Sequence, residues 1–374
     1  MKQVTFNRPF VFSLIIPCYN EEQTLEFCLA RVLEIQDAML TLDIIIVDDC
    51  SQDRSYEIAQ ELVRNHPEIQ VLKHNQNQGK GAALRTGFAH ARGEFVGVQD
   101  ADLEYNPMEL RNLLVPLVSQ GADMVFGSRY LTGQPRRVLY FWHSLTNRTL
   151  TFLSNMFTDL DLTDMETCYK LFRREVIQSV LIEENRFGFE PEIVAKVAQM
   201  RGRIWEMGIS YHGRTFAEGK KIYWKDGVRA LYCILHYNGP RLPLPLQFII
   251  YLFIGGVSAL INLTLFGTAL ATDWSISMAA TLASVAAAGL NYWLCIKLLF
   301  RHKARWNTFG EIFTYSLVVM SSCLVDVLLT TYLANSGLSS LTAKAMSCVV
   351  VLALNFLGRR FLVFPEPATG PWKP

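Results

Sequence analysis

Closely spaced acidic residues follow one of the β-rich segments of the chain. In the sequence QDADLEY, Asp100 and Asp102 come directly after a short apolar run, and Glu104 follows them. Carboxylates that converge at a strand end suit a hard divalent cation, and Mg²⁺ in proteins takes one or two carboxylates together with substrate phosphates. The spacing predicts a metal site made of Asp100, Asp102 and Glu104. The alternative is a solvated acidic turn before the helix that opens near Pro107.

A second acidic group ends another apolar run, in IIIVDDCSQDRS. Asp48 and Asp49 are placed to accept hydrogen bonds from ribose hydroxyls or from a base N–H. Helix capping is the alternative for this segment, and it accounts for Ser51 or Asp53 but not for the two adjacent aspartates.

Two glycines flank Lys80 in NQGKGAALRTGF, at a predicted helix start. The segment lacks the spacing of the P-loop and of the dinucleotide-binding glycine motif. A tight helix entry is therefore predicted, with a backbone or Lys80 contact to a nucleotide.

The elements that must position these residues are short strands that alternate with helices. β-rich runs occupy residues 11–16, 43–47, 69–72, 94–99 and 123–127, and helical stretches separate them. This alternation is typical of an α/β domain with a mainly parallel sheet, whose ligands bind at the carboxyl ends of the strands. Asn20 is predicted to cap the first helix and Pro107 to open another.

Composition divides the chain of 374 residues into two parts. From Gln247 onward the chain carries eight Lys and Arg and four Asp and Glu, whereas the first 246 residues carry 27 and 30. No basic stripe with interleaved aromatics is present, so nucleic acid is excluded as an expected partner. The eight cysteines form no CxxC pairs, which argues against zinc and favours a reducing compartment.

The sequence from Gln247 onward predicts an internal repeat of apolar helices. Runs at 247–270, 276–296, 311–334 and 341–363 are long enough to cross a bilayer. YLFIGGVSALIN at 251–262 aligns with YSLVVMSSCLVD, and NYWLCIKLLF at 291–300 aligns with NFLGRRFLVF, both 64 residues later. We therefore predict four membrane helices in two repeated hairpins.

Loop charges predict the orientation of these helices. Arg301, Lys303 and Arg305 join the second and third runs, and Arg359 and Arg360 lie near the last exit. Positive loops stay in the cytoplasm, so both termini and the α/β domain are expected there, most simply at a bacterial inner membrane. Residues 224–237 predict an amphipathic helix at the membrane interface, with docking on the α/β domain as the alternative.

Asp326 is the residue most costly to place inside a membrane. Its repeat mate Asn262, and the pair Asn291 and Asn355, are expected either to form hydrogen bonds between helices or to help a glycolipid headgroup across the bilayer.

Several motifs in fixed order resemble the family-2 glycosyltransferases of the GT-A fold. These motifs are PCYNE, VDDCSQD, NQGKGAA, DADLEY and GSRY. Longer segments are similar to the dolichol-phosphate mannose synthase branch of the family and its bacterial polyprenyl-phosphate relatives, namely GSRYLTG, LTDMETCYKLF, FGFEPEI and YHGRTFAEGKKIYWKDG. Residues 247–364 resemble GtrA-like membrane domains. The domains expected are 1–222 (cytosolic GT-A), 223–246 (interfacial helix and linker), 247–364 (membrane domain) and 365–374 (cytoplasmic tail).

The resemblance implies a set of site residues. Those expected around the nucleotide sugar are Pro17, Tyr19, Glu21, Asp48, Asp49, Lys80, Asp100, Ala101, Asp102, Arg214 and Lys220. Arg129, Arg136 and Arg137 would meet the acceptor phosphate, and Asp102, Arg129, Arg214 and Lys220 would be catalytic. Some relatives carry Gln in place of Glu104.

The implied reaction is metal-dependent, with Mg²⁺ or Mn²⁺, and moves a hexose from a GDP- or UDP-linked sugar to dolichyl or undecaprenyl phosphate with inversion. The glycolipid product would serve cell-envelope or glycoconjugate glycosylation. Two alternatives are a processive polysaccharide synthase, disfavoured because QxxRW is absent after DADLEY, and a lipid-linked-sugar transporter whose α/β domain senses nucleotide sugar.

Overall fold

The computed structural model describes residues 5–131, 137–138, 140–213, 224–239, 242–272, 274, 276–300, 308–338 and 340–364. The chain forms two compact units that meet between Ile234 and Leu235. Each unit is described by itself.

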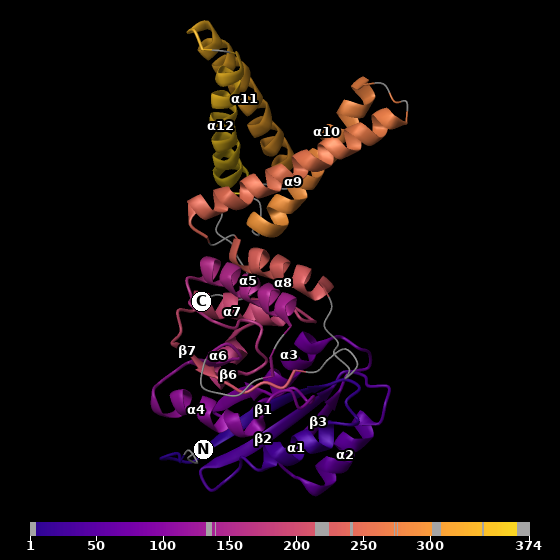
Figure 1. Ribbon diagram of the computed structural model, residues 1–374, viewed down its shortest axis with the longest axis vertical. Coiled ribbons are helices and arrows are strands. Elements are labelled where there is room, and N and C mark those ends of the chain that lie inside the picture. The colour runs from indigo at the N-terminus through magenta and orange to yellow at the C-terminus, as the bar shows by residue number, and fades with distance from the viewer. Residues whose placement is uncertain are drawn as a thin grey trace. The chain divides into compact units, whose positions relative to one another are not determined.

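The first unit is built on a seven-stranded sheet with the order β3-β2-β1-β4-β6-β5-β7 (Figure 1). Its strands are β1 (Phe10–Cys18), β2 (Leu40–Asp48), β3 (Ile69–Lys73), β4 (Phe95–Val98), β5 (Met124–Ser128), β6 (Lys170–Arg173) and β7 (Ile204–Gly208). β1, β2, β3 and β4 are mutually parallel, and β5 pairs with β7 in parallel. Only β6 runs antiparallel to its neighbours β4 and β5. The expected mainly parallel α/β sheet is confirmed.

Helices cover both faces of this sheet. The elements between the strands are α1 (Leu25–Leu33), α2 (Ser55–Asn65), α3 (Lys80–His90), the 3₁₀ turn η1 (Pro107–Glu109), α4 (Leu110–Ser119), α5 (Phe141–Thr158), α6 (Arg174–Ser179) and α7 (Phe189–Gln199). α1 and α2 pack together, whereas α3 packs on β1 and β2 from the other face, because the chain reverses its direction along the sheet after β3.

The two helix starts predicted from Asn20 and Pro107 have different outcomes. The Pro107 prediction is confirmed, because η1 begins at Pro107 and leads into α4, and the Asn106 side chain accepts from the Met108 N–H. The Asn20 prediction is wrong: α1 begins at Leu25, and Asn20 adopts a φ of 53° while its side-chain oxygen accepts from the Gln52 N–H, 2.8 Å away. Asn20 thus joins the loops after β1 and β2.

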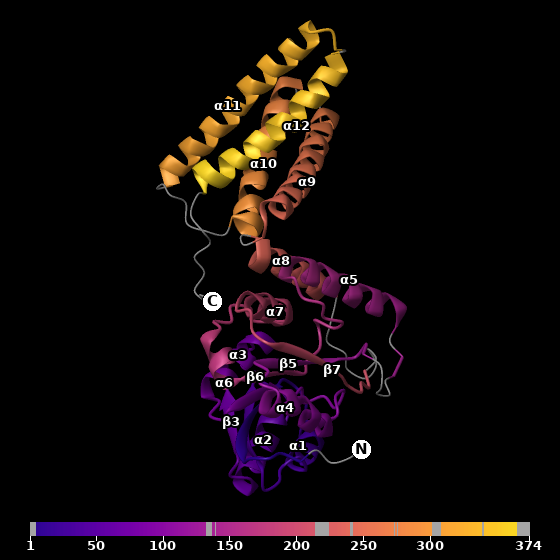
Figure 2. The same cartoon turned by 90° about the vertical axis from the view of Figure 1, so that its left-hand side faces the viewer.

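Helix α8 (Trp224–Asn238) belongs to the first unit up to Ile234, and this part runs beside α5, with α7 between the pair and the sheet (Figures 1 and 2). Ala230, Cys233 and Ile234 are buried, and Arg229 forms an ion pair with Glu184 at 2.7 Å. The opposite face leaves Val228 and Leu231 exposed. One face of this helix therefore docks on the α/β domain, as the alternative prediction stated. Its exposed apolar face has no partner within the described residues.

The described part of the second unit contains four long helices, α9 (Leu244–Ala271), α10 (Ile276–Leu294), α11 (Thr308–Asn335) and α12 (Ser340–Gly358). α9 packs against α10 and α11 against α12, as two hairpins (Figure 2). Among the described residues, one stretch, Leu244–Ala269, is long and apolar enough to cross a membrane by length and composition. The side chain of Asp326 lies outside the described residues.

The predicted internal repeat is confirmed in the helix bounds. α9 and α11 begin and end 64 residues apart, and so do α10 and α12. Each hairpin also finishes in a short π-helix, η4 (Cys295–Leu299) or η5 (Arg359–Val363), at the same offset. The closing residues Phe300 and Phe364 stack on each other with ring centroids 5.3 Å apart, so the two copies meet through equivalent side chains.

Candidate active site

The carboxyl ends of β1, β2 and β4 border one large cavity in the first unit. Its volume is about 1360 Å³. Because parallel strands end at the same edge of a sheet, the segments PCYNE, VDD and QDAD come together there. The predicted site residues among its lining are Pro17, Tyr19, Glu21, Asp49, Lys80, Asp100, Ala101, Asp102, Glu104 and Arg129.

Lys80 is the first residue of α3 and reaches the acidic end of the cavity. Its ammonium group lies 3.0 Å from both carboxylate oxygens of Asp100 and 3.4 Å from Glu190. Burial acts to lower the pKa of Lys80, but the carboxylates of Asp100 and Glu190 outweigh it and hold that pKa well above its usual range. Lys80 is thus a fixed positive charge beside the first aspartate of DAD.

The two glycines around Lys80 allow another loop to approach. A Cβ on Gly79 would lie 2.5 Å from the Asn185 carbonyl oxygen, and one on Gly81 would lie 2.4 Å from the Glu184 carbonyl oxygen. Gly79 also has a φ of +97°, which side chains rarely permit. The tight helix entry predicted for NQGKG is confirmed.

Asp49 organises this same entry. One of its carboxylate oxygens accepts from the Gln78 N–H at 2.9 Å and contacts the His74 ring nitrogen at 2.7 Å, and the other accepts from the Gly79 N–H at 2.6 Å. Asp48 is fully buried and accepts from the Ser51 N–H at 3.2 Å, and it does not line the cavity. Asp49 therefore positions the loop before Lys80 while facing the cavity.

The DAD segment presents two carboxylates at the cavity wall. Asp102 accepts from the Glu104 N–H at 3.1 Å, which tightens the turn, and Glu104 accepts from the Tyr211 hydroxyl at 2.8 Å. Within the described residues, no set of three His, Cys, Asp or Glu side chains is gathered at metal-binding distance. The donor set of Asp100 and Asp102 fits a hard cation that takes its other ligands from phosphate and water.

Arg129 lines the same cavity and is almost fully buried. Its guanidinium donates two hydrogen bonds of 2.7 Å to the Asp164 carboxylate, and the backbone N–H of Arg129 donates to the same carboxylate. Burial acts to lower the pKa of Arg129, but Asp164 raises it well above the usual range. The ring of Tyr211 lies 5.1 Å from the guanidinium, so Arg129 is rigidly held.

The remaining predicted arginines and lysine are placed differently. Arg137 is exposed, donates to the Gly213 carbonyl at 3.1 Å, and is not among the cavity-lining residues. Arg136, Arg214 and Lys220 lie outside the described residues.

Two glutamates in the cavity wall, the half-buried Glu166 and the buried Glu190, were missed by sequence reasoning. Glu166 and Glu190 each have a carboxylate oxygen with no hydrogen-bond partner among the described residues. Burial, followed by the negative charge of Glu190, raises the pKa of Glu166 to about 8. Acidic residues inside the apolar motifs LTDMETCYKLF and FGFEPEI were the available signal, because a buried acid without a cation is costly.

The apolar part of the cavity comes from α5 and α8. Trp142, Leu145, Leu153, Val228 and Leu231 line it, and Trp142 is 75% exposed. Next to Trp142, Tyr140 and Phe141 are also largely exposed. One cavity therefore joins a charged end at the sheet to an apolar rim at the surface of the first unit.

Comparison with known proteins adds two family matches. Residues 13–181 match the model of glycosyl transferase family 2, and residues 250–364 match the GtrA/DPMS transmembrane domain. The chain is 30% identical over 219 residues to the undecaprenyl-phosphate mannosyltransferase of Micrococcus luteus, covering 55% of this chain and 85% of that protein. The chain belongs to glycosyltransferase family 2. Both parts of the expected family assignment are confirmed.

A second relative of this family-2 glycosyltransferase is the dolichol-phosphate mannosyltransferase of Pyrococcus furiosus. It is 30% identical over 233 residues, which cover 61% of this chain and 64% of the relative. The chain thus spans a little less than two thirds of that relative's length.

A solved structure supports the GT-A fold of the first unit. Glucosyl-3-phosphoglycerate synthase from Mycobacterium tuberculosis, crystallised with Mn²⁺, uridine diphosphate and glucosyl-3-phosphoglycerate, matches with a TM-score of 0.50 and 18% identity, covering 63% of this chain and 81% of that chain. At this identity the likeness concerns the fold alone.

Proposed function

We propose that this family-2 glycosyltransferase moves a hexose from a GDP- or UDP-linked sugar to the phosphate of a polyprenyl phosphate, with inversion at the anomeric carbon. The observation that carries the proposal is the single cavity with carboxylates and Lys80 at one end and the exposed apolar residues of α5 and α8 at the other. A water-soluble nucleotide and a lipid phosphate need these two environments side by side. The names of the Micrococcus and Pyrococcus relatives agree with a hexose as the transferred group and a polyprenyl phosphate as the acceptor.

The chemistry needs no strong general base. A phosphate monoester has a second pKa of about 6, so its oxygen is largely ionised at neutral pH. This oxygen attacks the anomeric carbon and forms the new C–O bond as the bond to the diphosphate breaks, and the electron pair leaves with the nucleoside diphosphate. The protein has to align the two anions and stabilise the departing charge.

The residues around the cavity divide between these tasks. Pro17, Tyr19 and Glu21 lie where a nucleoside would enter, and Asp49 holds the loop that carries Lys80. Arg129, positioned by Asp164, would face the acceptor phosphate. Arg136, Arg137, Arg214 and Lys220 keep their proposed roles at the acceptor and at the diphosphate.

Asp100 and Asp102 would hold Mg²⁺ or Mn²⁺ together with the donor diphosphate. When bound, such a cation offsets the negative charge that develops on the leaving group. Glu104 is the proposed third ligand, although its carboxylate is engaged by Tyr211. The Mycobacterium synthase of similar fold was crystallised with Mn²⁺ and uridine diphosphate, which agrees with a divalent cation as cofactor.

The cellular arrangement proposed is a bacterial inner-membrane protein with both termini and the catalytic unit in the cytoplasm. The domain limits proposed from the sequence, 1–222, 223–246, 247–364 and 365–374, also belong to this proposal. A reporter fused after Pro374 is expected to show cytoplasmic activity, and periplasmic activity of the reporter would contradict the orientation.

The proposed reaction is tested with membranes that contain the full chain, polyprenyl phosphate and one nucleotide sugar at a time. The expected products are nucleoside diphosphate and a polyprenyl-phosphate hexose, identified by mass. Asp102→Asn is expected to lower the rate by at least about a hundredfold, because it removes a charge aimed at the leaving group. The control Asp161→Asn changes an exposed aspartate outside the cavity and should keep the wild-type rate. Equal rates in both variants would reject the site.

A further inference from the structure

The second unit contains a buried arginine at the junction of its two hairpins. Arg359 is the first residue of η5 and is only 7% exposed. Its equivalent in the first hairpin, 64 residues earlier, is Cys295. The repeat thus departs from its own pattern by placing a permanent positive charge where the other copy has a small neutral side chain.

Neutral groups from both hairpins surround this charge. The Arg359 guanidinium donates to the Asn291 side-chain oxygen and lies 3.8 Å from the Cys295 sulfur. The rings of Tyr315 and Tyr251, which are themselves repeat mates, lie 4.6 and 5.4 Å from it. Aromatic faces stabilise a cation but do not neutralise it.

The charge is not matched by an acidic partner among the described residues. No ion pair in that part of the chain includes Arg359, and its Nε has no hydrogen-bond partner there. Arg129, Arg173 and Arg229 each form an ion pair with a carboxylate in the first unit. Asp326 lies eleven residues after Tyr315 on α11, which places its backbone about 16 Å further along the helix.

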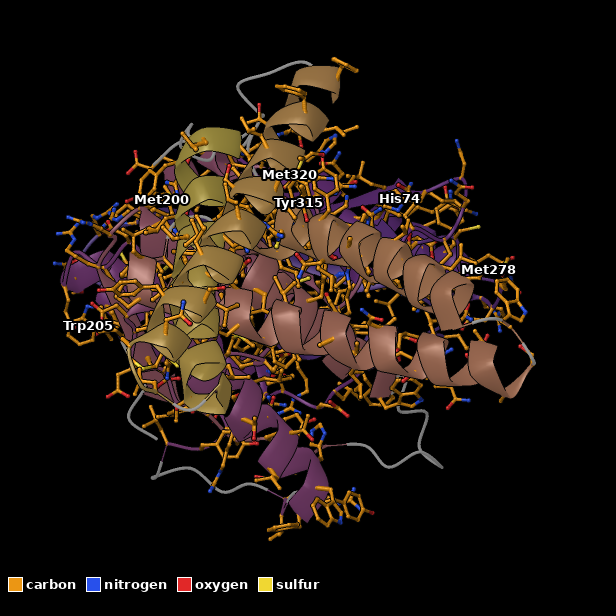
Figure 3. All side chains as sticks on the ribbon, turned by 90° about the horizontal axis from the view of Figure 1, so that it is seen from above. His74, Met200, Trp205, Met278, Tyr315 and Met320 are labelled. Carbon is orange, nitrogen blue, oxygen red and sulfur yellow. The ribbon has the colours of Figure 1, made fainter. Side chains whose placement is uncertain are left out.

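A cavity of about 420 Å³ opens beside Arg359. Its wall comes from α9, α10, α11 and η5, and the polar residues in it are Ser258, Asn262, Asn291, Tyr315, Ser316 and Arg359. Asn291 also donates to the Ser258 hydroxyl at 3.2 Å, a hydrogen bond between helices of the kind expected for this residue. In Figure 3, Tyr315 and Met320, which both line the cavity, are labelled on α11, whereas Met278 lies near the start of α10.

We propose that this cavity is a binding site for a phosphate group, with Arg359 as the cation that holds it. A buried guanidinium with an unpaired N–H and hydroxyl and amide groups around it offers an oxyanion several donors at once, and arginine suits phosphate because its N–H groups form a planar fork. A bound anion would also offset the cost of the unpaired buried charge.

The phosphate can come from three sources: the monoester of a polyprenyl phosphate, the diester of a phospholipid, or inorganic phosphate. The cavity shares no residue with the one in the first unit, so the inference stands independently of the proposed transfer reaction. The competing explanation is that Arg359 only joins the hairpins through Asn291, Tyr251 and Tyr315.

The test measures ligand binding to the purified full chain in detergent by native mass spectrometry. The probes are a short-chain polyprenyl phosphate, phosphatidylglycerol and inorganic phosphate, added separately. Arg359→Gln removes the charge. Arg360→Gln is the matched control because, among the described residues, Arg360 donates to the Phe364 carbonyl oxygen, lies over the Phe361 ring and does not line the cavity.

We expect Arg359→Gln to weaken binding of at least one probe about tenfold or more, as hydrogen bonds to a charged group predict, and Arg360→Gln to leave it within about twofold. The probe affected identifies the source of the phosphate. Equal affinity of wild type and Arg359→Gln for all three probes would overturn the proposal.

A second variant keeps the test decisive if Arg359→Gln fails to fold. Ser316→Val removes a hydroxyl from the cavity wall and touches none of the contacts that hold Arg359 between the hairpins. Weaker binding of the same probe in this variant supports the site, whereas unchanged binding of all three probes contradicts it.

Discussion

Glu166 gives the chain a pH-dependent stability that can be measured by replacing this residue with glutamine. Its pKa is raised from 4.5 to about 8 by burial and by Glu190, with the charges of Lys170, Arg129 and Asp164 also facing it. Between these two values the folded chain holds a proton that the unfolded chain has released. The contribution of Glu166 to stability is therefore complete below about pH 4.5 and is lost as pH rises through about 8.

The expected change in the free energy of unfolding follows from the release of one proton. Within this window one proton makes stability fall by about 3 kcal/mol over the two pH units from 5.5 to 7.5. Glu166→Gln keeps the shape of the side chain and does not titrate. For a unit of this size, the Tm of Glu166→Gln relative to wild type should rise by roughly 5–10 °C across that interval.

The assay is thermal unfolding of the full chain in detergent at each pH, with the wild-type Tm subtracted. Contributions of the second unit are common to both proteins and cancel. The control Glu175→Gln alters an exposed residue of α6 and should give a constant difference. A Glu166→Gln difference that stays flat from pH 5.5 to 7.5 would refute the inference that Glu166 is protonated in the folded chain.

Three further predictions test other parts of the structure. Asp164→Asn leaves the Arg129 guanidinium buried without its carboxylate and should lower the free energy of unfolding by about 3–5 kcal/mol, measured as a lower Tm. The control Asp123→Asn affects the surface ion pair with Arg203 and should change the free energy of unfolding much less. Gly87→Ala places a Cβ 2.2 Å from Ile15 between α3 and β1 and should cost about 1–3 kcal/mol. Gly227→Ala is the control, because among the described residues its Cβ would meet Thr146 alone, at 3.9 Å, and alanine in helix α8 should leave the Tm unchanged or slightly raised; equal Tm values for the two variants would contradict this packing. Trp142→Ser should reduce the rate with a long-chain polyprenyl phosphate in vesicles more than with a short soluble analogue, and an equal loss for both would argue against lipid contact by α5.

Much of the fold could be predicted because its signals are local. Five strands are marked by β-branched runs, and the repeat is marked by one register that places Asn291 over Asn355 and Phe300 over Phe364. β6 and β7 were not predicted. β6 has only four residues and begins with the buried Lys170, and β7 contains Trp205 and Glu206 at partly open positions, so neither shows a clear apolar pattern.

The site was predictable to the extent that topology fixes it. Parallel strands bring PCYNE, VDD and DAD to one edge, so the acids that end them had to meet. The partners of these acids depend on tertiary contacts instead. Sequence could not show that Asp49 would accept from Gly79, that Asp164 would hold Arg129, or that Glu166 would share a cavity wall with Glu190.

The most direct test of the central claim is the mass of the lipid product formed when the full chain receives a nucleotide sugar and polyprenyl phosphate. We predict a polyprenyl-phosphate hexose that appears in equal amounts with nucleoside diphosphate and is lost in Asp102→Asn. Nucleoside diphosphate released together with free hexose, and with the polyprenyl phosphate left unmodified, would contradict the account.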